Sequence, residues 1–177
     1  MRRFLDRLYD FSGYAAACAL LVIFCLVAIQ VLARLLDGAM RVLGLESVGF
    51  AVPSIAEICG FLLAAASFLA LAKTLTSFAH IRVGMFVDRF APAPRRWAEI
   101  FAGGVASLIG IYATIALARL TLKSFTFNDV SYGVVPVPLA LPQGVMTLGL
   151  AILTLALIDL TIRVASGEIV LRSGPEQ

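Results

Sequence analysis

Residues 11–33 read FSGYAAACALLVIFCLVAIQVLA, and no charged side chain interrupts these 23 positions. A helix of about 20 mostly apolar residues is long enough to cross the roughly 30 Å hydrocarbon core of a bilayer. Lipid offers no hydrogen-bond partner to the backbone, so a spanning segment must be a helix or part of a closed barrel. The apolar residues here are continuous and do not alternate with polar ones, which disfavours a barrel strand. The stretch predicts a membrane-spanning helix.

Three further stretches lack charged residues, at 58–72, 100–118 and 130–158. Together the four stretches predict spans at approximately 13–35, 53–77, 98–120 and 141–163. The composition agrees, because 14% of the residues are charged, whereas soluble domains contain about 25%. We therefore expect an all-α integral membrane protein of four transmembrane helices, with residues 1–177 forming a single membrane domain.

The basic residues lie near the predicted span ends and are unevenly divided between the two sides. One side has Arg2, Arg3, Arg7, Arg82, Arg89, Arg95, Arg96, Arg163 and Arg172, and the other has Arg34, Arg41, Arg119 and Lys123. Loops rich in Lys and Arg stay in the cytoplasm, so we expect both termini and the middle loop there. The basic residues form no run, which argues against a nucleic-acid partner.

The connections carry weaker signals. Residues 35–44 have apolar side chains at helical spacing, which fits either an interfacial helix after the first span or an ordinary helix end. The Ala-Pro-Ala-Pro segment at 91–94 predicts a turn, with the third helix beginning at Trp97. Proline in a first turn loses no hydrogen bond, so the fourth span should begin near Leu141 or Pro142. The apolar residues before it, from Val134 onward, should lie against the membrane surface or a protein partner.

Two charged residues border the first and second spans at similar depth. Arg34 lies near the end of the first span and Glu57 near the beginning of the second, and consecutive antiparallel helices would bring them together. An unpaired charge in the membrane costs several kcal/mol, so we predict an ion pair between them. In one interpretation the pair serves structure or a partner contact. In the other, Glu57 is a carboxylate that couples transport to H⁺ or Na⁺.

Further polar residues gather at the expected cytoplasmic end. Asp159 and Arg163 are one helical turn apart and can pair on one face of the fourth span, while Lys73 and His80 approach the same level from the second span. A structural anchor is the favoured interpretation, and a proton relay through Asp159 and His80 is the alternative.

Small residues form two rows that favour close helix packing. One row contains Gly103, Ser107, Gly110 and Thr114 in the third span, and the other contains Gly60, Ala64 and Ser67 in the second. These rows serve either the chain's own bundle or a partner helix.

The sequence contains no catalytic constellation. His80 is the only histidine, which is too few for a bis-histidine haem site or a zinc cluster, and Cys18, Cys25 and Cys59 lack metal-ligand spacing. No phosphate-binding glycine loop followed by lysine occurs. We therefore expect neither an enzyme nor a cofactor site in this chain.

Three short segments stand out beside the spans. They are Glu57-Ile-Cys-Gly-Phe-Leu-Leu at the beginning of the second span, His80-Ile-Arg-Val at its end, and Pro136-Val-Pro-Leu-Ala-Leu-Pro-Gln-Gly before the fourth. With the four spans, they resemble the small membrane subunit of tripartite ATP-independent periplasmic (TRAP) transporters over residues 1–166. The family usually has an aromatic residue, often tryptophan, near the proline of the last segment, and this chain departs from that pattern.

The resemblance implies a bacterial inner-membrane protein that scaffolds a large membrane subunit. That subunit would carry an organic acid using a Na⁺ gradient, and a periplasmic binding protein would deliver the acid. The structural or partner-interface candidates are then Arg34, Glu57, Lys73, His80, Arg82, Asp159 and Arg163, with membrane lipids as the remaining partner. The alternative function is a self-sufficient small four-helix exporter or ion-coupled carrier that uses Glu57. A third option is an accessory subunit of an unrelated membrane complex.

Overall fold

The computed structural model describes residues 2–46, 49, 53–77 and 92–167, and four long helices account for most of them. They are α1 (Arg2–Val42), α2 (Ile55–Thr76), α4 (Pro92–Phe127) and α5 (Ala140–Ala165). Each helix is long and apolar enough to cross a membrane, and the described residues contain no strand. The predicted fold class and number of spans are confirmed, while the side of the membrane that holds the termini stays a prediction.

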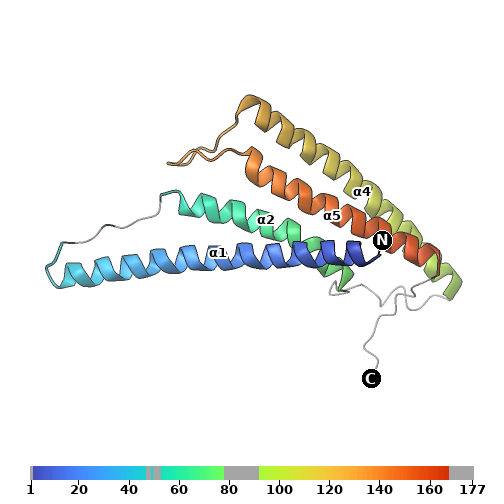
Figure 1. Ribbon diagram of the computed structural model, residues 1–177, viewed down its shortest axis with the longest axis horizontal. Helices are drawn as coiled ribbons and strands as arrows, with labels where there is room; N and C mark the ends of the chain where they lie inside the picture. Colours follow the sequence, from blue (N-terminus) through green and yellow to red (C-terminus); the bar gives the residue numbers. More distant parts are fainter. Residues whose placement is uncertain (1, 47–48, 50–52, 78–91, 168–177) are drawn as a thin grey trace, which may run out of the picture.

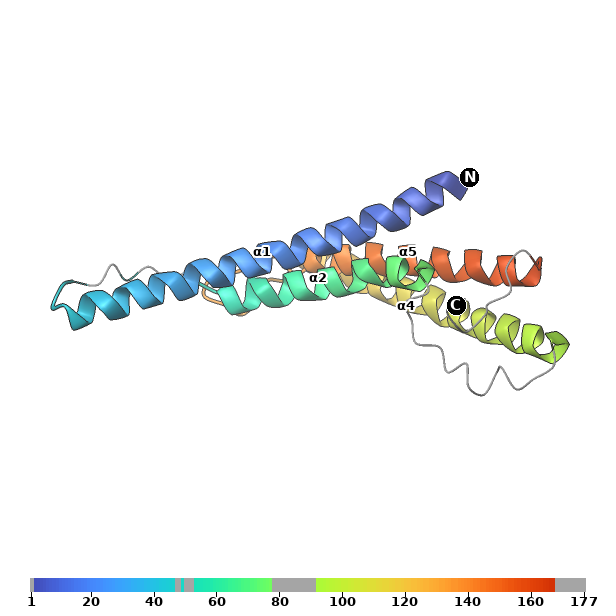
Figure 2. The same cartoon turned by 90° about the horizontal axis from the view of Figure 1, so that it is seen from below.

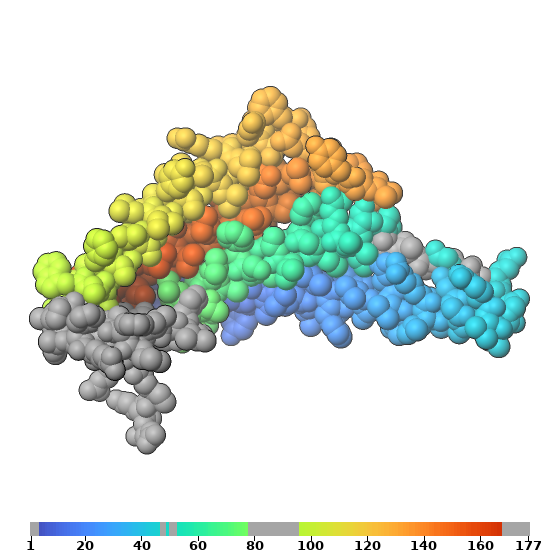
Figure 3. Space-filling model, turned by 180° about the vertical axis from the view of Figure 1, so that it is seen from behind, coloured from blue at the N-terminus to red at the C-terminus, as the bar shows by residue number. Residues whose placement is uncertain are grey.

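The four helices form a single layer in the order α1, α2, α5, α4 (Figure 1). The last helix in the chain, α5, lies between α2 and α4, parallel to α2 and antiparallel to α4. Seen from below, the layer is thin, and α1 diverges from it toward the N-terminus (Figure 2). In the space-filling view the side chains of α2, α5 and α4 lie next to one another (Figure 3). α1 and α4 therefore form the edges, and both broad faces of the layer are open.

A row of covered side chains along α1 explains its contact with α2. Buried or half-buried residues recur there every three or four positions, at Tyr9, Ser12, Ala16, Ala19, Ile23, Leu26 and Gln30. This spacing is the heptad pattern of a left-handed helix pair. Beside the row, a Cβ atom at Gly13 would lie 2.9 Å from Cγ of Lys73. The glycine thus makes room for the lysine stem and marks the register between the two helices.

The backbones of α5 and α2 touch at Gly149. A Cβ atom at this position would lie 2.7 Å from the carbonyl carbon of Phe68 and 2.9 Å from the amide nitrogen of Leu69. The obstacle is main chain, so no side-chain rotation could relieve an overlap. Helices in lipid associate through such close approach, because no hydrophobic effect drives them together.

Threonines of α5 face glycine and threonine on α4. The hydroxyl oxygens of Thr154 and Thr114 lie 3.1 Å apart, and Gly110 leaves space for the same Thr154 side chain. Thr147 and Thr121 repeat the hydroxyl contact at 3.0 Å. The α4 surface that packs on α5 contains the predicted row of Gly103, Ser107, Gly110 and Thr114, so this prediction is confirmed.

The beginning of α4 differs from the sequence prediction, and that of α5 agrees with it. α4 begins at Pro92 and not at Trp97, so the predicted turn at 91–94 is wrong for its last three residues. Proline in a first helical turn has no intrahelical hydrogen bond to lose, which explains why Pro92 is tolerated there. α5 begins at Ala140, next to the predicted Leu141.

α1 is a single uninterrupted helix. Its 41 residues end at Val42, so the helical residues predicted as an interfacial helix or a helix end continue the first span directly. At 1.5 Å per residue, α1 is about 62 Å long, roughly twice the thickness of the hydrocarbon core. The helix therefore extends beyond the apolar layer, and no separate interfacial helix follows it among the described residues.

The contact at Gly149 predicts a large effect from a single methyl group. We expect Gly149→Ala to lower the free energy of unfolding by about 1 to 3 kcal/mol, because the added carbon meets backbone atoms that cannot yield. Gly144→Ala is the matched control, since a Cβ there would lie 3.8 Å from the nearest side-chain atom. Thermal unfolding in detergent, followed by circular dichroism, measures both, and equal midpoints for the two variants would contradict the prediction.

Candidate functional site

The predicted site residues lie toward the two ends of the layer. We call the end that holds the first residues of α1 and α4 the terminal end, and the opposite end the loop end (Figure 1). Arg34 and Glu57 lie toward the loop end, and Lys73, Asp159 and Arg163 lie toward the terminal end. The other two predicted residues, His80 and Arg82, lie outside the described residues.

The predicted ion pair between Arg34 and Glu57 is not formed. Arg34 is exposed, and it has no acidic partner among the residues that the structure describes. The register between α1 and α2 gives the reason. Counting from the contact of Gly13 with Lys73, Gln30 reaches the level of Glu57, and Arg34 lies one helical turn farther out. Arg34 and Glu57 occupy similar positions relative to the apolar stretches in the sequence, but they do not lie at the same level in the structure.

The connection between α4 and α5 folds into a hairpin over residues 128–139. Val130 and Pro138 form an antiparallel bridge, and the Ser131 N–H donates to the Val137 carbonyl at 2.9 Å. Asn128 begins the reversal with φ 51°, in the left-handed region that asparagine tolerates. The hairpin contacts α2 of the same chain through Val135 and Ser54. Val134 is 85% exposed, so the contact of this segment with the membrane surface or a protein partner stays a prediction.

The hairpin is fastened to the beginning of α2 at a contact that we call the loop junction, made by Ser54, Glu57, Gly133 and Val135. The Val135 N–H donates to Oγ of Ser54 at 3.0 Å. A Cβ atom at Gly133 would overlap the Glu57 carboxylate and lie 2.9 Å from Oγ of Ser54. Oε2 of Glu57 is buried and has no hydrogen-bond partner among the described residues. Glu57 is thus placed against the hairpin backbone and not against a cation.

An apolar hollow of about 270 Å³ adjoins the loop junction. It lies between α2, the hairpin and α5, and its eight lining residues, among them Ile58, Phe61 and Leu141, are all apolar. Such a lining provides no ligand to an ion moving past Glu57. The surroundings of Glu57 therefore favour its structural interpretation over the coupling one.

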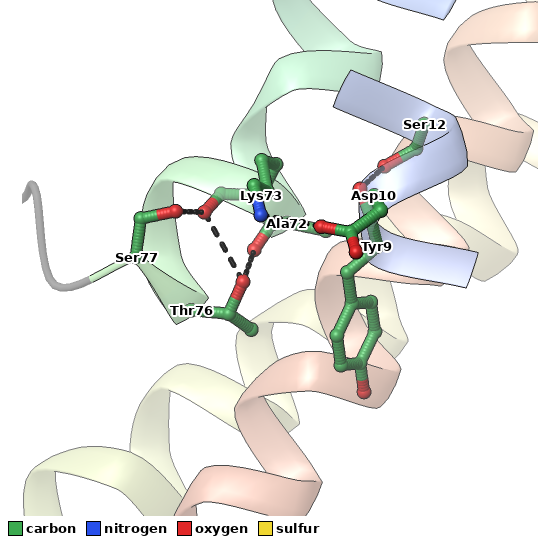
Figure 4. A network of polar contacts seen from close by, with 7 residues as sticks. All are labelled: Tyr9, Asp10, Ser12, Ala72, Lys73, Thr76 and Ser77. Atoms are coloured by element: carbon green, nitrogen blue, oxygen red, sulfur yellow. Dashed lines mark hydrogen bonds and ion pairs between the residues drawn. The ribbon is translucent and has the colours of Figure 1, made fainter. Parts of the chain in front are cut away.

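At the terminal end, α1, α2 and α5 meet in a polar cluster over a small core (Figure 4). Lys73 of α2 forms an ion pair with Asp10 of α1. The neighbouring Tyr9 is 2% exposed and packs with Ala72 and Ala156, and its ring points away from Lys73 toward α5. Its hydroxyl is buried without a hydrogen-bond partner in the described part of the chain. Tyr9 therefore fastens α1 to α5 by packing.

Two other contacts complete the terminal end. Asp159 and Arg163, one turn apart on α5, form the predicted pair, with 3.8 Å between their charged atoms. Arg96 of α4 donates a hydrogen bond to the carbonyl of Ala165, one of the groups that a helix leaves unpaired at its end. The first contact lies within α5, and the second joins α4 to α5 through a side chain and a backbone carbonyl.

Sequence reasoning missed residues at both ends, for different reasons. Asp10 directly precedes the charge-free residues 11–33, and Lys73 directly follows 58–72. On antiparallel helices these two charges border the apolar layer on the same side, so their pairing was available as a signal. Ser54 and its partner Val135 are separated by 81 positions, and nothing in either segment points to the other.

The loop junction and the polar cluster at the terminal end hold the helices together. The described residues contain no group of His, Cys, Asp and Glu that could hold a metal ion. At the loop junction a hydroxyl and a carboxylate meet backbone atoms of the hairpin, and at the terminal end an ammonium meets a carboxylate. Such contacts hold helices in register, and they supply no pair of nucleophile and base.

Comparison with known proteins identifies one family. The model of the DctQ component of tripartite ATP-independent periplasmic transporters matches residues 23–167, which is 145 of the 177 residues. The match includes α2, α4 and α5 completely and α1 from residue 23 to its end. Searches of curated proteins and of solved structures gave no match.

The loop junction predicts that alanine at position 133 is destabilising because of Glu57. We expect Gly133→Ala to lower the free energy of unfolding by about 1 kcal/mol, since the carboxylate can swing aside only in part. Adding Glu57→Ala should restore most of this loss, because it removes the overlapping atoms. Glu46→Ala, a change at an exposed glutamate outside the junction, should restore nothing. Thermal unfolding in detergent measures all variants, and additive losses for positions 133 and 57 would refute the contact.

Proposed function

The chain belongs to the DctQ family of tripartite ATP-independent periplasmic (TRAP) transporter components, and from this premise we propose that it scaffolds the large membrane subunit of such a transporter. In this proposal the large subunit carries an organic acid together with Na⁺, and a periplasmic binding protein delivers the acid. The family is a transporter component and not an enzyme family. The Na⁺ gradient acts on the complex, and this subunit holds no cofactor.

The main support for the proposal is that few residues of the four spans are buried within the chain itself. In the apolar windows of the four helices, between 6% and 17% of the residues are buried. A carrier that worked alone would surround its substrate with its own helices near the midplane, and a single layer has no interior for this. A scaffold needs a broad apolar surface, and the layer provides two.

Continuous helices that are fastened at both ends support a stationary role. Many carriers bind substrate where helices are interrupted near the midplane, whereas the four helices here continue without a break. The loop junction joins the hairpin to α2, and the pair of Asp10 and Lys73 joins α1 to α2. Sliding of one helix along the next would break these contacts, so the layer suits the fixed part of a moving transporter.

We place the terminal end in the cytoplasm and the helices across the inner membrane of a bacterium. The argument is the excess of Lys and Arg at that end, which includes Arg7, Arg96 and Arg163, because basic segments stay on the cytoplasmic side. Lipids cover the surface that no protein occupies. The candidate residues Arg34, Glu57, Lys73, His80, Arg82, Asp159 and Arg163 then serve as structural or partner-interface groups.

The proposal predicts that a much larger polytopic membrane protein co-purifies with this chain. The measurement is a mild-detergent pull-down of the tagged chain from its native membrane, with mass spectrometry of the recovered proteins and an unrelated tagged membrane protein as control. Recovery of the chain alone, or as a homodimer, would contradict the scaffold function. It would favour a self-sufficient exporter and make Glu57 the coupling residue to test.

Replacing Glu57 with glutamine separates a structural from a coupling role. Glutamine keeps the size of the side chain beside Gly133, so we expect normal assembly and an uptake rate reduced by no more than about threefold, under 1 kcal/mol. Glu46→Gln, at an exposed position, is the matched control. Complete loss of uptake in a complex that assembles normally would show that Glu57 takes part in coupling.

A further inference from the structure

The helices of the layer bury little of their surface against one another. In the apolar windows of the four spans, at most 17% of the residues are buried. Large apolar side chains such as Phe24, Phe101 and Tyr112 are exposed by more than 70%. The layer therefore has ample apolar surface to give to a partner, and its two faces have to be compared.

One face of the layer carries a hollow toward the terminal end. The hollow measures about 220 Å³ and lies between α2, α4 and α5, with Leu75, Ala102, Ala106, Leu157 and Leu160 among its lining residues. We call the side on which these residues lie the hollow face. Figure 3 looks onto the layer from behind, where α5 lies between α2 and α4 and the N-terminal part of α1 is largely hidden.

The exposed surface of α2 belongs to the hollow face. Leu63, Ser67, Leu71 and Leu75 follow one another at intervals of four residues, so they form one row along the helix. Leu75 lines the hollow, and Leu63 and Ser67 are exposed. The row thus leads from the hollow along the open side of α2 toward the loop end.

Gly60 lies on the same side of α2, two turns before Ser67. It is exposed, and a Cβ atom placed on it would meet no atom of the chain within 4 Å. Gly110 and Gly149, in contrast, face atoms of another helix at contact distance. Glycine disfavours a helix interior, and in membrane helices it permits close approach of a second backbone. The predicted packing row of Gly60, Ala64 and Ser67 has this room, and none of the four described helices occupies it at Gly60.

The opposite face presents bulky side chains. On α5, Leu148, Leu155 and Ile162 are spaced by seven residues and are 63%, 47% and 61% exposed. Leu155 and Ile162 are each two positions from a hollow residue, Leu157 or Leu160, which is about 200° around the helix. Large apolar side chains keep another backbone at a distance, and flexible lipid chains fill the space between them.

We propose that the hollow face is the docking surface for a transmembrane helix of the large membrane subunit. This helix would approach the α2 backbone at Gly60 and Ser67 and place a side chain in the hollow. The inference rests on the proposed function, because that function supplies the partner within the membrane. Lipid chains are the other available occupant, but small residues give them no advantage, whereas they bring two helix backbones into contact.

Photo-crosslinking from the two faces in the native membrane tests the assignment. A benzophenone amino acid is incorporated at Ser67 on the hollow face or at Leu155 on the opposite face, and both side chains are exposed in this chain. We expect a product with the combined mass of the chain and the large subunit from Ser67 and none from Leu155. Products from Leu155 alone, from both positions equally or from neither would overturn the inference.

A pair of glycine substitutions gives an independent measurement. Gly60→Leu and Gly104→Leu add the same side chain at positions where a Cβ atom meets nothing within 4 Å, and Gly104 lies two positions from both Ala102 and Ala106, away from the hollow. We expect Gly60→Leu to reduce recovery of the large subunit in a pull-down by about tenfold, as loss of a central contact does. Gly104→Leu should leave recovery nearly unchanged.

The outcomes separate this inference from the proposed function. Equal recovery of the large subunit with both variants overturns the choice of face and leaves the scaffold function intact. Failure of the unmodified chain to recover any large subunit overturns the scaffold function itself, and the inference with it. Monodisperse elution of the Gly60→Leu and Gly104→Leu chains in detergent shows that each variant is folded.

Discussion

The backbone contact between α5 and α2 at Gly149 is the constraint on which the rest of the layer depends. The pairs α1–α2 and α4–α5 each join helices that follow one another among the described elements, so each can form locally. The extensive contact of α2 with α5 brings the two pairs together. At such a close approach, dispersion forces between the two backbones act in place of the hydrophobic effect that would drive association in water.

Polar groups are used according to their position along the helices. In the middle of α5, Thr147 and Thr154 donate to backbone carbonyls four residues earlier and also lie against threonines of α4. Their hydroxyls are therefore satisfied where no water is available. Charged groups are kept for the ends, where Lys73 pairs with Asp10 and Arg96 meets the end of α5. Contacts in the middle set the distance between helices, and contacts at the ends set their register.

Features that depend on local sequence could be predicted, whereas contacts that depend on the register between two helices could not. Uninterrupted apolar stretches predicted four spans, and the pair of Asp159 and Arg163 followed from one helical turn of spacing. The pair of Arg34 and Glu57 failed, because the relative shift of α1 and α2 is set by tertiary contacts such as Gly13 with Lys73. The loop junction was missed for the same reason, since its two segments meet only after the helices have assembled.

An open layer is stable in a bilayer for a reason that does not hold in water. Apolar faces in water must be buried, and four helices then close into a bundle. In lipid the distance between neighbouring helices depends on side-chain size, because small residues let two backbones come close. At the edges, α1 exposes Phe11 and Phe24, and α4 exposes Phe101 and Tyr112, each by 70% or more. Bulky edges end the layer, so further association depends on its faces, where side-chain size again decides which helices meet.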